Sequence, residues 1–182
     1  MKNISAVVLD IEGTVTPIAF VHETLFGYIR KDLKNFLETT WESKETIESV
    51  NSLRTETEKL NEGRENKIST ILPESTKKEQ LMQSTYDNVI ALMDLDLKVT
   101  PLKQLQARIM ESGFKSSQIV AEVYQDAIDS LKTWKSLNVP VYIYSSGSIA
   151  AQKMLFKHTK EVNKFINKRV FCFFDWNQMI GE

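Results

Sequence analysis

Two short apolar runs, far apart in the chain, have the residue pattern of buried β-strands. Residues 6–9 are all small or aliphatic, and residues 139–144 are rich in β-branched and aromatic side chains. Runs of this kind are typical of parallel strands that are covered on both faces. We therefore predict an α/β fold with a Rossmann-like parallel-sheet core that contains both strands.

The long stretch between these strands is predicted to be mostly helical. Apolar residues recur there at near-helical spacing, which indicates helices with one buried face. Asn61-Glu62-Gly63 predicts the end of one helix, Thr100-Pro101 predicts the start of another, and Gly113 predicts its end. Further helices are expected over residues 122–137 and 149–156. The apolar positions are Phe20, Leu25, Phe26, Ile29, Leu33, Phe36, Leu37, Ile47, Val50, Leu53, Leu60, Leu102, Leu105 and Ile109.

The first predicted strand ends in an acidic loop, with Asp10 and Glu12 followed by Gly13 and Thr14. Open α/β sheets bind ligands just beyond the carboxyl ends of their strands. Two carboxylates at this position suit Mg²⁺, which prefers oxygen ligands, and a carboxylate can also attack phosphorus. A solvated acidic turn is the alternative interpretation, and this segment alone does not decide between the two.

The second predicted strand ends in Ser145, Ser146 and Gly147, and a helical pattern follows. Serine hydroxyls and the N–H groups at a helix N-terminus all donate hydrogen bonds, so the turn could bind an anion. An ordinary serine N-cap is the alternative interpretation. An acidic strand end combined with a donor-rich strand end is more specific than either motif alone.

Composition fits a globular protein without a nucleic-acid or membrane partner. The chain has 182 residues, 42% of them hydrophobic, with a net charge of −1. This charge favours neither nucleic acid nor an anionic membrane. The single cysteine, Cys172, excludes an internal disulfide. We find no membrane-length apolar segment, and we expect a cytoplasmic protein with access to the nucleus.

Both motifs resemble signatures of the haloacid dehalogenase-like phosphatases. Asp10-Ile11-Glu12-Gly13-Thr14 is similar to their first signature, and Ser145 resembles the hydroxyl of their second. The stretches VVLDIEGTVTPIAFVHETLFGYIR and VPVYIYSSGSIAAQKMLF are similar to the enolase-phosphatase E1 family of methionine salvage. Glu12 is typical of that family, which carries Glu at this position, whereas most phosphatases of the superfamily carry Asp. The resemblance covers roughly residues 4–159.

The resemblance implies a Mg²⁺-dependent phosphatase with a helical cap. Residues 1–15 and 118–182 would form the core, and residues 16–117 the cap. Asp10 would be the nucleophile and Glu12 the acid and base, and both would contact the metal. Ser145, Ser146 and Gly147 would bind the substrate phosphate. The implied substrate is the small phosphoester 2,3-diketo-5-methylthio-1-phosphopentane, which is enolised and then dephosphorylated to the acireductone by what we expect to be a monomer.

After Thr159 the similarity to this family is expected to stop. The third-signature lysine and the fourth-signature acid are not assigned to Lys164, Lys168 or Asp175, because the context differs. We therefore expect a core that is incomplete at the C-terminus, in which residues 170–174 either supply a substitute strand or promote aggregation. A catalytically inactive, truncated form with a binding or regulatory role, and a phosphatase for another small phosphoester, are the alternatives. His22 is a candidate substrate contact or a structural histidine.

Overall fold

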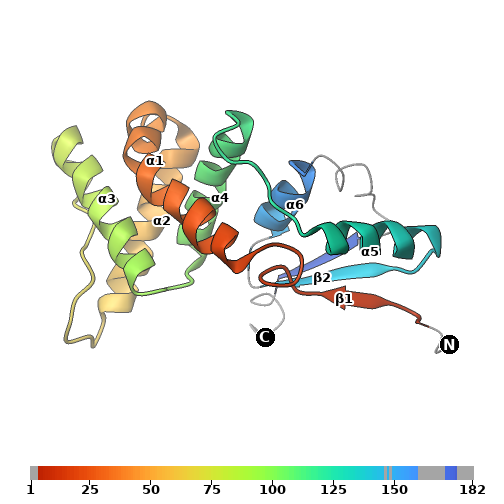
Figure 1. Ribbon diagram of the computed structural model, residues 1–182. Helices are drawn as coiled ribbons and strands as arrows, with labels where there is room; N and C mark the ends of the chain where they lie inside the picture. Colours follow the sequence, from red (N-terminus) through yellow and green to blue (C-terminus); the bar gives the residue numbers. More distant parts are fainter. Residues whose placement is uncertain (1–3, 146, 148, 160–170, 176–182) are drawn as a thin grey trace. The chain divides into compact units, whose positions relative to one another are not determined.

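The structure, a computed structural model, describes residues 4–145, 147 and 149–159 and the backbone of 171–175. It divides into two compact units, one formed by Met1–Tyr28 with Met110–Glu182 and the other by Ile29–Ile109. The elements in chain order are β1 (Val7–Leu9), the π-helix η1 (Phe20–Leu25), α1 (Phe26–Thr40), α2 (Lys44–Asn61), α3 (Lys78–Asp94), α4 (Thr100–Lys115), α5 (Gln125–Ser136), β2 (Val141–Ser145), α6 (Ile149–Lys157) and β3 (Phe171–Asp175) (Figure 1).

The first unit contains a parallel sheet with strand order β1-β2-β3. Val7 pairs with Val141 and Leu9 with Ile143, while Ser145 at the end of β2 pairs with Asp175 at the end of β3. The predicted α/β fold with a parallel sheet is confirmed. Of the two outcomes expected for residues 170–174, the structure shows the strand.

One expectation about β1 is wrong. The sequence predicted a strand covered on both faces, but Val8 is 65% exposed. Successive side chains of a strand point to opposite faces, so Val8 faces away from the side on which Val7 and Leu9 contact the core. Figure 1 shows α5 and α6 on the same side of the strands, which explains why one face of β1 is covered and the other is open.

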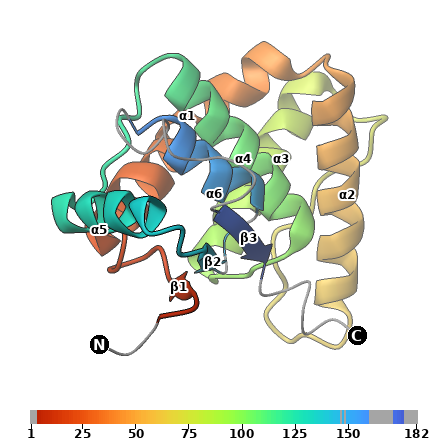
Figure 2. The ribbon, with the colours of Figure 1, turned by 90° about the vertical axis from the view of Figure 1, so that its right-hand side faces the viewer.

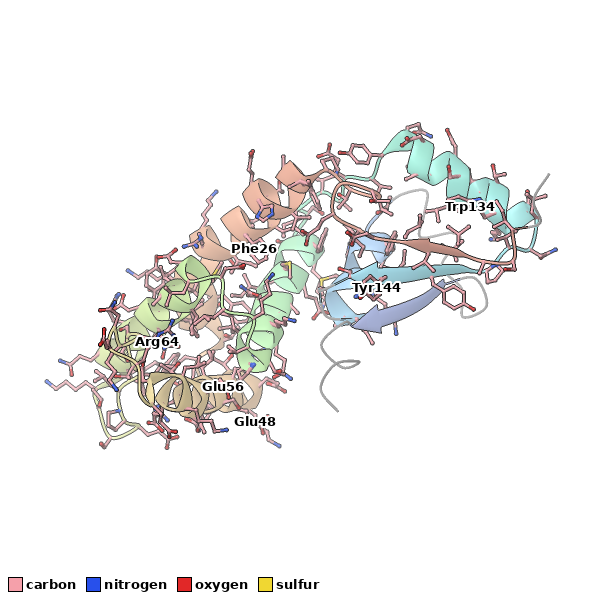
Figure 3. The ribbon with its side chains drawn as sticks, turned by 90° about the horizontal axis from the view of Figure 1, so that it is seen from below. Phe26, Glu48, Glu56, Arg64, Trp134 and Tyr144 are labelled. Atoms are coloured by element: carbon pink, nitrogen blue, oxygen red, sulfur yellow. The ribbon has the colours of Figure 1, made fainter. Side chains whose placement is uncertain are left out.

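The core of the first unit joins the sheet to its helices. Val141 and Ile143 of β2 are at most 1% exposed and pack in one cluster with Leu131 of α5 and Phe156 of α6. Trp134, labelled in Figure 3, packs against this cluster from α5. The packing of α5 and α6 therefore fixes β2, the strand that leads to the candidate site at its carboxyl end.

The second unit consists of α2, α3 and most of α1 and α4 (Figure 2). The predicted apolar faces of α1, α2 and α4 are confirmed by the burial of Ile29, Leu33, Phe36, Leu37, Val50, Leu53, Leu102, Leu105 and Ile109. Ile47 is an exception, since it is 46% exposed although its spacing placed it on the buried stripe. The bounds of α3 were not predicted from sequence.

Two polar side chains connect the helices of the second unit. The Arg108 guanidinium lies 5.3 Å from the centre of the Phe36 ring and donates to Thr46 Oγ1 at 3.1 Å and to Ser49 Oγ at 3.3 Å. Asn88, which is fully buried, donates from Nδ2 to Thr57 Oγ1 and to the carbonyl oxygen of the loop residue Ser69. These bonds join α4 to α1 and α2, and α3 to α2 and the following loop.

Gly113 does not end its helix as predicted, because α4 continues to Lys115. A Cβ atom at Gly113 would lie 2.6 Å from both Ile119 Cδ1 and Tyr28 Cε1. The glycine therefore permits close packing inside the helix, and the chain turns only at Ser117, whose φ is 59°. The next helix also starts later than the predicted residue 122, at Gln125.

Helices long and apolar enough to cross a membrane are absent from the described part of the chain.

Candidate active site

The acidic loop after β1 is held in one conformation by its own backbone. The Ile11 carbonyl accepts hydrogen bonds from the N–H groups of Val15 at 2.9 Å and Thr16 at 3.0 Å, and Gly13 N donates to Thr16 O at 2.8 Å. Gly13 has a φ of +74°, a conformation that glycine adopts without steric strain. The loop is thus a tight turn that returns the chain to Thr16.

Distant residues fix this loop to the rest of the first unit. The Thr16 hydroxyl, which is fully buried, donates to the Glu122 carbonyl, and Tyr124 N donates to Val15 O at 3.0 Å. Ile11 and Val15 lie in the apolar core. These anchors restrict the backbone of Glu12, which lies between Ile11 and Val15, and of Asp10, which directly precedes Ile11.

Asp10 and Glu12 both remain exposed to solvent. Asp10 Oδ1 accepts a hydrogen bond from Ile11 N at 2.7 Å. Its other oxygen, Oδ2, makes no hydrogen bond within the described residues. One carboxylate oxygen is therefore oriented by the backbone and the other is accessible for chemistry.

At the end of β2, Ser145 is buried and Gly147 is half-buried. Ser145 Oγ accepts a hydrogen bond from Gly147 N at 3.1 Å. Because a hydroxyl both donates and accepts, this bond occupies a lone pair and leaves the proton available for another acceptor. Ser146 lies outside the described residues.

The sheet brings the two strand ends to the same edge. β1 and β2 are parallel neighbours, with Leu9 opposite Ile143, so Asp10 follows β1 directly beside the end of β2. Neighbouring strands lie about 4.8 Å apart, which brings the acidic loop and Ser145 within reach of one small anion. The structure thus places the two strand ends side by side, whereas the catalytic roles of the residues stay a prediction.

Gln152 of α6 was not among the site residues predicted from sequence. This side chain is 2% exposed and donates from Nε2 to the Gly147 carbonyl at 2.7 Å. An amide two positions before the apolar Met154-Leu155-Phe156 was the available signal, since a polar residue beside the buried face of a helix requires a partner.

The donor set at the end of β1 fits Mg²⁺. Mg²⁺ is usually bound by one or two carboxylates, with water and substrate phosphate completing its coordination. Asp10 and Glu12 supply carboxylates on an exposed turn, and Asp10 Oδ2 is accessible. A group of three or more acidic, histidine or cysteine side chains suited to a metal does not occur among the described residues. Lys164 and Lys168 lie outside them, and Asp175 is placed by its backbone alone.

The two histidines differ in their surroundings. His22 on η1 is exposed, with its ring centre 6.1 Å from that of Phe26, and its role as a substrate contact stays a prediction. The His158 ring stacks on Phe114 at 4.9 Å. This contact gives His158 a structural role in packing.

Comparison with known proteins extends the similarity seen in the motifs. The chain is 46% identical to enolase-phosphatase E1 of Naegleria gruberi, over 85% of this chain and 60% of that protein. It is 42% identical to enolase-phosphatase E1 of Aquifex aeolicus, over 86% of this chain and 61% of that protein. The chain therefore spans about three fifths of the length of these curated relatives.

A solved structure shows the same fold. The UTR4 protein of Saccharomyces cerevisiae aligns with 96% of this chain and 68% of its own, with a TM-score of 0.67 and 33% sequence identity. The model of the haloacid dehalogenase-like hydrolases matches residues 4–175. This match includes β3 and so extends past Thr159, where the resemblance was expected to stop. The chain belongs to the haloacid dehalogenase-like hydrolase family.

Proposed function

We propose that this chain is a phosphatase of the enolase-phosphatase E1 type. Its substrate would be 2,3-diketo-5-methylthio-1-phosphopentane, which is enolised and dephosphorylated to the acireductone of methionine salvage. The observation that carries the proposal is the parallel pairing of β1 with β2, which joins the acidic loop and the Ser145 turn at one edge. The names of the similar proteins support the choice of substrate.

In the first step, an Asp10 oxygen attacks the phosphorus atom. The bond between phosphorus and the substrate oxygen breaks, and an aspartyl-phosphate forms. Glu12 gives its proton to the leaving oxygen, so the product departs as an alcohol or enol rather than as an anion. Support comes from Asp10, whose Oδ1 is held by Ile11 N while Oδ2 is accessible.

In the second step, water attacks the phosphorus atom of the aspartyl-phosphate. Glu12, now ionised, accepts a proton from that water, the bond to Asp10 breaks, and inorganic phosphate leaves. Asp10 and the protonated Glu12 are regenerated. The exposed Glu12 side chain on a tightly bonded turn suits a group that must alternate between acid and base.

The phosphate would be bound by the Ser145 hydroxyl together with Ser146 and Gly147. Ser145 is supported in this role by its accepted bond from Gly147 N, which leaves its proton to donate. Mg²⁺, held by Asp10 and the backbone carbonyl of Glu12, would offset the repulsion between the attacking carboxylate and the phosphate. We assign no residue to the enolisation. The cap role of residues 16–117, the monomeric state and the cytoplasmic and nuclear location stay predictions.

Phosphate release tests this function. The full chain is incubated with the diketo phosphoester and excess Mg²⁺, and inorganic phosphate and acireductone are measured. Asp10→Asn should abolish turnover, whereas Asp126→Asn should retain it. Asp126 is a matched control, because it is also exposed and its Oδ1 also accepts from the next backbone N–H, at 2.8 Å.

A second variant tests the two-step chemistry. Glu12→Gln should slow hydrolysis of the intermediate, so the intact protein should gain the mass of one phosphoryl group when substrate is present. Wild-type turnover no greater than that of Asp10→Asn would refute the phosphatase proposal.

A further inference from the structure

We propose that Gln152 is a positioning residue that holds Gly147, and through it the Ser145 hydroxyl, in place to bind phosphate. The inference rests on the proposed function, because it assigns the turn to phosphate. It concerns a residue of α6 that need not touch the substrate. Its effect would pass through Gly147 to the Ser145 hydroxyl.

Both backbone polar groups of Gly147 have side-chain partners. Its N–H donates to Ser145 Oγ at 3.1 Å, and its carbonyl accepts from Gln152 Nε2 at 2.7 Å. Glycine has more backbone freedom than any other residue, so these two bonds restrict Gly147 itself. The shorter of them comes from a helix that packs in the core.

The burial of Gln152 argues against a space-filling role. It is 2% exposed, and its neighbours along α6, Leu155 and Phe156, belong to the apolar core. A buried amide loses its hydration, whereas an apolar side chain of similar length would fill the same volume without that loss. The hydrogen bond to Gly147 is a feature that an apolar residue could not provide.

The coupling to Ser145 follows from the geometry of its hydroxyl. While Gly147 N occupies a lone pair of Oγ, the Ser145 proton can point to another acceptor, such as a phosphate oxygen. Without the bond from Gln152, rotation of Gly147 would break its contact with Oγ and release the hydroxyl. Phosphate affinity should then fall although Ser145 itself is unchanged.

The test measures binding of inorganic phosphate to the full chain in excess Mg²⁺ by calorimetry. Gln152→Met keeps the length of the side chain but removes the donor, and we expect it to weaken phosphate binding about tenfold, the effect of one lost hydrogen bond. Ser145→Ala should weaken binding to a similar or greater extent. Gln152→Leu serves as a second variant if the methionine variant does not fold.

Thr159→Val is the matched control. Thr159 is also buried, at 6% exposed, and follows α6, but its hydroxyl donates to the Leu155 carbonyl rather than to the turn. We expect this variant to bind phosphate as the wild type does. Amide hydrogen exchange at Gly147 gives a second readout, and it should be faster in Gln152→Met while exchange along β2 is unchanged.

The outcomes separate this inference from the proposed function. If Ser145→Ala weakens phosphate binding while Gln152→Met changes neither binding nor Gly147 exchange, the role of Gln152 is refuted and the phosphatase proposal stands. Equal weakening by Gln152→Met and Thr159→Val would also overturn it, because the effect would then be general destabilisation. If Ser145→Ala has no effect, the phosphate site itself is wrong.

Discussion

Replacement of Gly113 by alanine tests whether close packing, rather than helix termination, explains this glycine. Gly113 lies inside α4, and an added Cβ would be 2.6 Å from Ile119 Cδ1, 2.8 Å from Ile119 Cγ1 and 2.6 Å from Tyr28 Cε1. Carbon atoms in van der Waals contact are normally about 3.5–4.0 Å apart. Ile119 is 3% exposed and has little space to move.

Two opposing terms set the expected magnitude. Alanine is better than glycine inside a helix by about 1 kcal/mol. An extra carbon in a well-packed core costs typically about 1–3 kcal/mol. Two core side chains must move in this case, so we expect Gly113→Ala to lower the free energy of unfolding by about 0.5–2 kcal/mol.

Gly27→Ala provides the matched control. Gly27 also lies in a helix, α1, but a Cβ there would have no atom within 4 Å. Only the helix-propensity gain remains, so the free energy of unfolding should rise by about 0.5–1 kcal/mol. Urea unfolding of the two single variants should therefore give shifts of opposite sign.

A third variant identifies the clashing group. Ile119→Val removes Cδ1, so the cost of Gly113→Ala should be smaller in the Ile119→Val background than in the wild type. Stabilisation by Gly113→Ala equal to that by Gly27→Ala would refute the packing argument and return Gly113 to an ordinary helix position.

Three other substitutions test contacts described above. Arg108→Met should lower the free energy of unfolding by about 1–3 kcal/mol in a urea titration, because it removes two hydrogen bonds and the contact with the ring on α1; no change would show that the guanidinium is not bound there. Asn88→Ala should lower the free energy of unfolding by about 2–4 kcal/mol, because it removes a fully buried amide that bonds to α2 and to the loop after it. Limited proteolysis should then cleave this loop, residues 62–77, faster than in the wild type. Thr16→Val keeps the side-chain shape but removes the hydroxyl that donates to the Glu122 carbonyl, so the free energy of unfolding should fall by about 1–3 kcal/mol and amide exchange at Tyr124 should be faster. Unchanged exchange at Tyr124 would contradict the anchoring role of Thr16.

The elements that sequence predicted best were those with a strong local pattern. The apolar stripe of α1, the Asn61 end of α2 and the Thr100 start of α4 all depend on residues within a few positions of one another. Gly113 was misread because its role depends on Ile119 and on Tyr28, which lies in another helix. Exposure of Val8 could not be read from its run either, because it depends on which face the helices cover.

The candidate site was predicted in part, because some of its residues stand out from the sequence and others do not. Asp10, Glu12 and Ser145 stood out because their chemistry interrupts apolar strands, and pairing of the two strands brings their ends together. Gln152 did not stand out, since a single amide beside an apolar helix face has many explanations. Its bond to Gly147, which becomes visible in the structure, distinguishes it from an ordinary polar residue of a helix.

The discontinuity of the first unit has a consequence for how the chain folds during synthesis. β1 is made first, but its partner β2 follows only after the whole helical stretch between them. At roughly 5–20 residues per second, β1 must wait on the order of ten seconds for that partner. The intervening helices, whose contacts are more local, should collapse during this interval. A ribosome stalled after α4 has left the exit tunnel, but before β2 has, should therefore carry a protease-resistant helical intermediate attached to a still-extended strand β1.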